Sequence, residues 1–99
     1  MFILKDKDEV LGFAYVSLDE DEYGDGKTYA DLNQIYIKTD NRAKGAGGFL
    51  LNFIEDYLRE KGVVGLHSAL YINNQISLNF HKKNGFKITS TYHNLYKPL

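Results

Sequence analysis

The glycines at Gly45, Gly47 and Gly48 stand at the start of a helix-like stretch, shortly after Arg42 and Lys44. A helix start exposes unpaired backbone N–H groups and carries a partial positive charge. Glycine lacks the Cβ atom that would keep a ligand away from that backbone. Such a segment suits an anion, above all a phosphate or pyrophosphate, and the two cationic side chains would add to the attraction. The alternative is that the glycines are only structural.

Two common phosphate-binding patterns do not fit these glycines. A P-loop needs a Lys-Ser or Lys-Thr pair after its last glycine, whereas Phe49 follows Gly48 here. The dinucleotide pattern G-x-G-x-x-G fails because Leu50 occupies the position of the third glycine. The rest of the chain therefore has to identify the phosphate ligand.

The hydrophobic pattern predicts a mixed α/β chain built around one sheet. Predicted strands cover residues 2–4, 10–16, 29–37, 63–72 and 86–92, and a short last strand within 94–99 is left open. The first predicted helix runs from the glycines to Gly62, and the second lies within 73–85 and stops at Asn84-Gly85. Five carboxylates between 19 and 25 indicate a solvated turn, with attraction of a cationic substrate as the alternative.

Periodicity also assigns faces to these elements. In the predicted strand 29–37, an unbroken period of two places Asp31, Asn33, Ile35 and Ile37 opposite to Leu32, Gln34 and Tyr36. In the first predicted helix, the apolar stripe consists of Phe49, Leu50, Phe53, Ile54, Tyr57 and Leu58.

Composition limits the class of protein. A chain of 99 residues supports one domain, which we expect to cover 1–99. The chain contains no cysteine, which fits a reducing cytoplasm, and His67, His81 and His93 lack the spacing of metal ligands, so we expect no metal. A net charge of −1 provides no global attraction for nucleic acid, and no apolar run approaches the roughly 20 residues of a membrane span.

Two motifs, with a predicted strand between them, carry a family resemblance. The first is Ile35-Tyr36-Ile37, a four-residue turn, and then Arg42-Ala43-Lys44-Gly45-Ala46-Gly47. The second is Asn74 followed by a helix that carries Phe80-His81, Lys83, and Gly85-Phe86. In this order they resemble the signatures of the GNAT superfamily of N-acetyltransferases, which bind acetyl-coenzyme A. The resemblance covers about residues 2 to 99.

The resemblance implies a fold and a set of cofactor contacts. The fold would be a central, mostly antiparallel twisted sheet with two helices and a V-shaped splay between the strands that flank the glycine-rich helix. Backbone of Ile35, Tyr36 and Ile37 would pair with the pantetheine arm. Asn74 would bond the cofactor arm, and Lys83 would lie near the nucleotide phosphates, unless it belongs to a solvated helix face. The pyrophosphate would be held by Arg42, Ala43, Lys44, Gly45, Ala46, Gly47 and Gly48.

The resemblance further implies direct transfer of an acetyl group from acetyl-CoA to a primary amine of a small molecule or peptide. Asp31 stands where several members carry a glutamate base, although aspartate is one methylene shorter. His67 or a water chain are the other candidates for the base. His81 replaces the tyrosine that usually protonates the leaving thiolate, and imidazole chemistry suits that step. The alternative for His81 is a histidine on the helix surface.

The front of the chain departs from the family. Members usually begin with a strand and two helices that wall the acceptor side, so we expect an N-terminally abbreviated form. The alternative is a non-catalytic coenzyme A binding module, or an acetyltransferase fragment whose acceptor site needs a partner chain, such as a second copy in a homodimer. A nucleic-acid or anion binder is a third hypothesis, which the net charge of −1 disfavours. The acceptor itself is not identified by the sequence.

Overall fold

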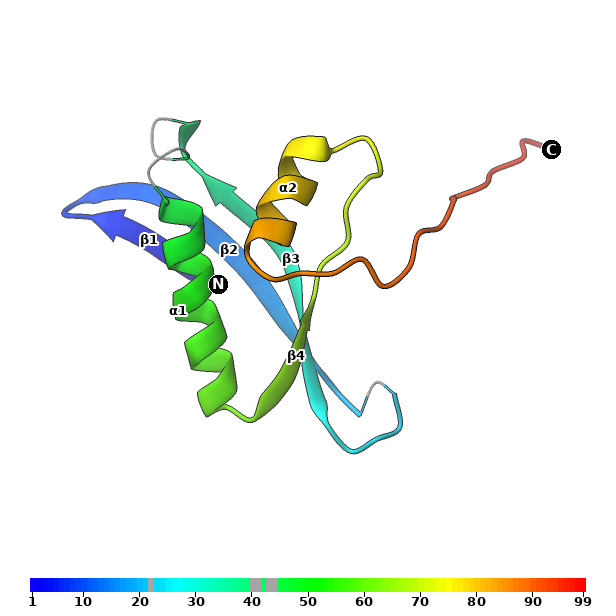
Figure 1. Ribbon diagram of the computed structural model, residues 1–99, viewed down its shortest axis with the longest axis horizontal. Helices are drawn as coiled ribbons and strands as arrows, with labels where there is room; N and C mark the ends of the chain where they lie inside the picture. Colours follow the sequence, from blue (N-terminus) through cyan, green and yellow to red (C-terminus); the bar gives the residue numbers. More distant parts are fainter. Residues whose placement is uncertain (22, 40–41, 43–44) are drawn as a thin grey trace. The chain divides into compact units, whose positions relative to one another are not determined.

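The computed structural model describes residues 1–21, 23–39, 42 and 45–99. The described residues form four strands and two helices (Figure 1). In chain order these are β1 (Phe2–Asp6), β2 (Glu9–Glu20), β3 (Thr28–Ile37), α1 (Ala46–Glu60), β4 (Val63–His67) and α2 (Gln75–Lys83). The chain forms two compact units: Met1–Ala69 contains the sheet and α1, and Leu70–Leu99 contains α2.

The four strands lie in the order β1-β2-β3-β4. β1 pairs with β2, and β2 with β3, in antiparallel fashion, whereas β3 and β4 are parallel. The β3–β4 ladder runs only from Thr28↔Val63 to Asp31↔His67, although β3 continues to Ile37 (Figure 1). The predicted mixed, mostly antiparallel sheet is confirmed. The predicted strand 63–72 is wrong beyond His67, because β4 ends where its pairing with β3 ends.

A bulge in β3 changes which residues face the core. The register of β3 against β2 shifts between Tyr15 and Val16, which makes Asn33 an extra residue in β3. Leu32 before the bulge and Ile37 after it are therefore both buried, with 4% and 7% of their surface exposed. The expectation that they lie on opposite faces is wrong. A strict alternation of faces assumes that no residue is inserted, and the bulge inserts one.

Helix α1 contacts β3 and β4 and closes the core of the first unit. Its buried positions are Gly47, Leu50, Leu51, Ile54 and Leu58. The predicted stripe omitted Leu51 and wrongly included three exposed aromatic residues, Phe49, Phe53 and Tyr57. Two of these rings make edge-on contacts with Phe2 of β1, at centroid distances of 6.3 Å for Phe53 and 5.4 Å for Tyr57. Large rings can cover the border of a sheet from the flank of a helix while part of each ring stays in water.

The second unit contains α2 and a C-terminal segment without regular structure. Residues 86–99, all of which are described, form neither helix nor strand. The predicted strand over 86–92 and the short last strand within 94–99 are therefore wrong. An isolated alternating segment is not stable as a strand, because its backbone groups need a paired neighbour. Apolar side chains there are exposed, for example Ile88 at 58% and Tyr92 at 72%.

Candidate functional site

The end of β3 presents backbone groups on the side that β4 leaves open. Lys38 donates its backbone N–H to the carbonyl oxygen of Leu11 at 2.8 Å, so this residue turns its polar groups toward β2. In an antiparallel ladder such residues alternate with ones that face the other way. Tyr36 therefore also faces β2, whereas Ile35 and Ile37 turn their N–H and C=O groups to the opposite edge. That edge belongs to the segment of β3 beyond the last rung with β4.

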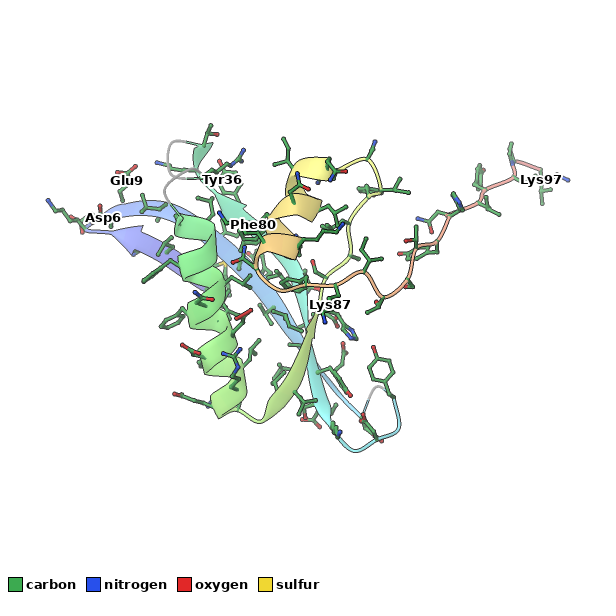
Figure 2. The ribbon with its side chains drawn as sticks, in the orientation of Figure 1. Asp6, Glu9, Tyr36, Phe80, Lys87 and Lys97 are labelled. Carbon is green, nitrogen blue, oxygen red and sulfur yellow. The ribbon has the colours of Figure 1, made fainter. Side chains whose placement is uncertain are left out.

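Arg42 folds back over this end of β3. Its Nε donates to the carbonyl oxygen of Ile37 at 2.8 Å. Its guanidinium carbon lies 5.5 Å from the ring centroid of Tyr36. Figure 2 shows Tyr36 at the end of β3 that leads toward α1. The predicted cationic side chain is thus held at the opened edge by one hydrogen bond and one cation–π contact.

The glycine-rich segment begins α1. Gly45 is the N-cap residue and has a left-handed backbone (φ +78°), which explains a glycine at this position without any ligand. Among the described residues, Phe49 makes the first helical bond, donating its N–H to the carbonyl of Gly45 at 3.0 Å. Among the described residues no side chain caps this helix start, and its first turn contains no acidic residue. The N–H groups of Ala46, Gly47 and Gly48 precede that first bond, as an anion site requires.

Part of the predicted anion site lies outside the described residues. This applies to Ala43 and Lys44, whose roles stay predictions. Gly47 is buried, which gives this glycine a packing reason as well.

Asp31 and His67 face each other across the last rung of the β3–β4 ladder. Oδ1 of Asp31 lies 3.9 Å from Nδ1 of His67, and the two side chains are 33% and 39% exposed. The hydroxyl oxygen of Tyr23 lies 3.0 Å from Nε2 and 3.3 Å from Nδ1 of the same imidazole. The structure thus brings together the two predicted candidate bases, Asp31 and His67. It also places Tyr23 beside them, a residue that the sequence did not predict as part of a site.

The turn between β2 and β3 is fixed against this cluster. The Tyr29 ring stacks on His67 at 5.8 Å, and the Tyr23 ring meets Tyr29 edge-on at 4.9 Å. The Tyr29 hydroxyl donates to Oδ2 of Asp25 at 2.7 Å. This bond, followed by the backbone N–H of Lys27, lowers the pKa of Asp25 below its usual value. Two described and exposed residues of the acidic turn, Tyr23 and Asp25, are therefore linked to His67 and to Tyr29, which stacks on it.

The remaining predicted residues lie on or next to α2, in the second unit. Asn74 is the N-cap of α2 and accepts the Ser77 N–H at 3.2 Å. Nδ1 of His81 lies 2.7 Å from the carbonyl oxygen of Ser77, so Nδ1 is the donor in that bond. His81 is only 4% exposed, which contradicts the alternative of a surface histidine. Lys83 ends α2 and is exposed.

The described part of the chain holds no group of three or more His, Asp or Glu side chains placed to bind a metal ion. Neither of its helices combines the length and apolar character that crossing a membrane requires.

Sequence alignment matches this chain to only part of the length of two acetyltransferases. The chain is 29% identical over 86 residues to an L-methionine sulfoximine/L-methionine sulfone acetyltransferase of Pseudomonas aeruginosa, which covers 82% of this chain and 46% of that protein. It is 31% identical over 62 residues to a spermidine N(1)-acetyltransferase of Thermoplasma acidophilum, which covers 63% of this chain and 38% of the relative. The chain thus spans less than half the length of these curated relatives.

The fold itself is found in solved acetyltransferase structures. An aminoglycoside N-acetyltransferase in complex with CoA superposes with a TM-score of 0.82 at 23% identity, over 98% of this chain and 74% of that one. This likeness confirms the predicted fold class. A family model described as Acetyltransferase (GNAT) family matches residues 1–86. The chain therefore belongs to the GNAT family of acetyltransferases.

Proposed function

We propose that this protein binds acetyl-CoA and transfers the acetyl group directly to a primary amine of a small molecule or peptide. One observation carries the proposal: the opened edge of β3 leads into a glycine-rich start of α1 that no described side chain caps. An extended arm with a phosphate end needs these two features in this order. Membership of the family and the acetyltransferase names of the relatives support it. We also propose that the two units form one catalytic domain over 1–99.

The edge of β3 would hold the pantetheine arm. Ile35 and Ile37 would pair with the arm's amide groups, as a peptide pairs when it adds to a sheet edge. The thioester carbonyl would lie further along the same edge toward Asp31, where backbone N–H groups of β3 beyond its last rung with β4 would polarise it. The N–H groups of Ala46, Gly47 and Gly48 would bind the pyrophosphate. Arg42 uses one of its five N–H donors to bind the carbonyl of Ile37, so its guanidinium lies at the end of β3 where the pyrophosphate would bind.

Acid–base roles complete the proposal. Transfer requires a neutral amine, so a proton acceptor must stand near the thioester, and Asp31 at the β3–β4 fork is our candidate. His81 would protonate the leaving thiolate. Because its Nδ1 donates to Ser77, that proton would come from Nε2. Asn74 and Lys83 remain the proposed contacts to the cofactor arm and the nucleotide phosphates, and the Asn74 side chain also caps α2.

Steady-state release of free thiol tests the proposal. The protein would be given acetyl-CoA and a panel of amines: spermidine, L-methionine sulfone, an aminoglycoside and a short peptide with a free amino terminus. We expect thiol release above the hydrolysis rate with at least one amine. Binding of acetyl-CoA without release on any amine would instead point to a non-catalytic coenzyme A module. Sedimentation with and without acetyl-CoA would test whether a second copy closes the acceptor side.

A further inference from the structure

The last rung of the β3–β4 ladder gathers a carboxylate, an imidazole and a phenol within the first unit. We infer that His67 takes the proton from the acceptor amine, and that Asp31 and Tyr23 position its ring and stabilise the protonated form. The inference rests on the proposed acetyl transfer. It assigns the removal of the amine proton to His67 with Asp31 beside it, instead of to Asp31 alone.

Oxygen atoms lie beside both nitrogens of His67. The Tyr23 hydroxyl is 3.0 Å from Nε2 and 3.3 Å from Nδ1, and Oδ1 of Asp31 is 3.9 Å from Nδ1. An imidazole that has gained a proton carries an N–H at each nitrogen and a full positive charge. Tyr23 is close enough to accept one of these N–H groups. The Asp31 contact is longer than a hydrogen bond, so this carboxylate acts through its charge.

The ring of His67 is held in place but remains accessible. Tyr29 stacks on one side at 5.8 Å with an interplanar angle of 26°, and the Tyr23 ring lies 5.7 Å away. Even so, 39% of the His67 side chain is exposed, compared with 33% for Asp31. A small amine can therefore reach the imidazole from solvent. An ordered, accessible base is what proton transfer in a bound complex requires.

The position along β3 also fits. Pairing with β4 ends at Asp31 and His67, and the opened edge of β3 begins at the next residue. Ile37 lies six residues after Asp31 along β3, which corresponds to about 20 Å at the usual rise per strand residue. An arm that starts at the helix and follows this edge inward points toward the His67 ring.

The type of side chain favours His67 over Asp31. A carboxylate of ordinary acidity is a poor acceptor for an ammonium proton at neutral pH, whereas an imidazole exchanges protons there. The aspartate side chain is also one methylene shorter than glutamate. Beside His67 its negative charge is useful without any need to reach the amine.

His67 takes one proton from the ammonium group, and the nitrogen lone pair then forms a bond to the thioester carbonyl carbon. The carbon–sulfur bond breaks, the nitrogen loses its second proton, and the thiolate gains one. His67 finally releases its proton to solvent, so each turnover yields an amide, a free thiol and one proton.

Kinetics of single variants test the assignment on the full chain. His67→Gln should lower kcat about 10² to 10⁴-fold, the usual contribution of a general base, and leave the KM for acetyl-CoA nearly unchanged. The dependence of the wild-type kcat/KM on pH should be lost in His67→Gln. The described groups that face this ring include Tyr23, Tyr29 and Asp31, with Asp25 behind Tyr29. His93→Gln is the matched control, because His93 is exposed in the C-terminal segment.

Two outcomes would overturn the inference. One is that His67→Gln keeps both kcat and the dependence on pH. The other is seen by NMR, without turnover: the ¹⁵N shifts of the His67 ring, which report the protonated nitrogen, stay the same in Tyr23→Phe and Asp31→Asn. If wild type binds acetyl-CoA but acetylates no amine, the proposed function fails by itself, and the NMR result still decides whether the three side chains are coupled.

Discussion

Nε of Arg42 donates a hydrogen bond to the carbonyl oxygen of Ile37 at 2.8 Å, which ties this residue, four positions before the start of α1, to the end of β3. The same guanidinium lies over the ring of Tyr36. Both contacts depend on a planar, multi-donor cation, since a lysine ammonium is a compact point charge. The placement of this cation therefore follows from the backbone of β3 as well as from the charge.

The first prediction concerns that guanidinium. Arg42→Lys keeps the charge but loses the planar donor, so we expect acetyl-CoA to bind about tenfold more weakly, which corresponds to roughly 1.4 kcal/mol. Isothermal titration of acetyl-CoA measures the change. Lys38→Ala is the control, because Lys38 pairs with Glu9 and not with Ile37. Equal affinity of Arg42→Lys and wild type would show that charge alone matters.

A second prediction concerns the core face of α1. Leu51 is fully buried, whereas Phe49 is 65% exposed. Leu51→Ala should cost about 2 to 5 kcal/mol of unfolding free energy, and Phe49→Ala well under half as much. Urea denaturation gives both values. The reverse order would mean that the stripe expected from the sequence, with Phe49 inside, is the correct one.

A third prediction uses the left-handed residue that ends α1. Gly62 has φ +81°, and its N–H donates to the carbonyl of Arg59 at 3.0 Å. Gly62→Ala should cost about 1 to 2 kcal/mol because a Cβ atom disfavours this backbone. Gly62→Asn should cost less, since asparagine tolerates the conformation. The same urea experiment compares them, and equal stability of all three proteins would contradict the assigned backbone.

The fourth prediction follows from the lowered pKa of Asp25. The Tyr29 hydroxyl is the main cause, so in Tyr29→Phe the pKa of Asp25 should rise toward its ordinary value. A lowered pKa stabilises the fold above the ordinary carboxyl range, and this contribution disappears as the pH falls through the pKa of the folded state. Tyr29→Phe should therefore show a weaker loss of stability in acid. NMR titration of the Asp25 carboxyl measures the shift, with Tyr15→Phe as control, and an unchanged pKa in Tyr29→Phe would refute the assignment.

Much of the fold and part of the site could be predicted from the sequence. The hairpin, the strand before the glycines, both helices and the helix ends at Gly62 and Gly85 follow from local patterns that depend on few long-range contacts. The glycine-rich start of α1 was predicted for the same reason, because its glycines are adjacent in the chain, and its binding of an anion stays a proposal.

Features that depend on pairing were not predictable. The extra residue at Asn33 shows only in the register against β2, so Leu32 was assigned to the wrong face. The expected strand over 86–92 has the right alternation but pairs with no strand in the structure. Tyr23 looked like part of a solvated turn, and its contact with His67 spans 44 residues of sequence. Local periodicity carries no information on such contacts.

The most direct test of the central claim is the melting temperature of the protein with and without acetyl-CoA, in wild type, Ala46→Glu and Ala46→Gln. At about 100 times the dissociation constant, binding should add about 2.7 kcal/mol, a rise on the order of 10 to 20 °C for a domain of this size. A glutamate in the first turn of α1 favours the helix itself but repels a pyrophosphate there. We predict a large rise for wild type and Ala46→Gln, and almost none for Ala46→Glu. No rise in wild type, or the same rise in all three proteins, would contradict the claim that the start of α1 binds the phosphates of acetyl-CoA.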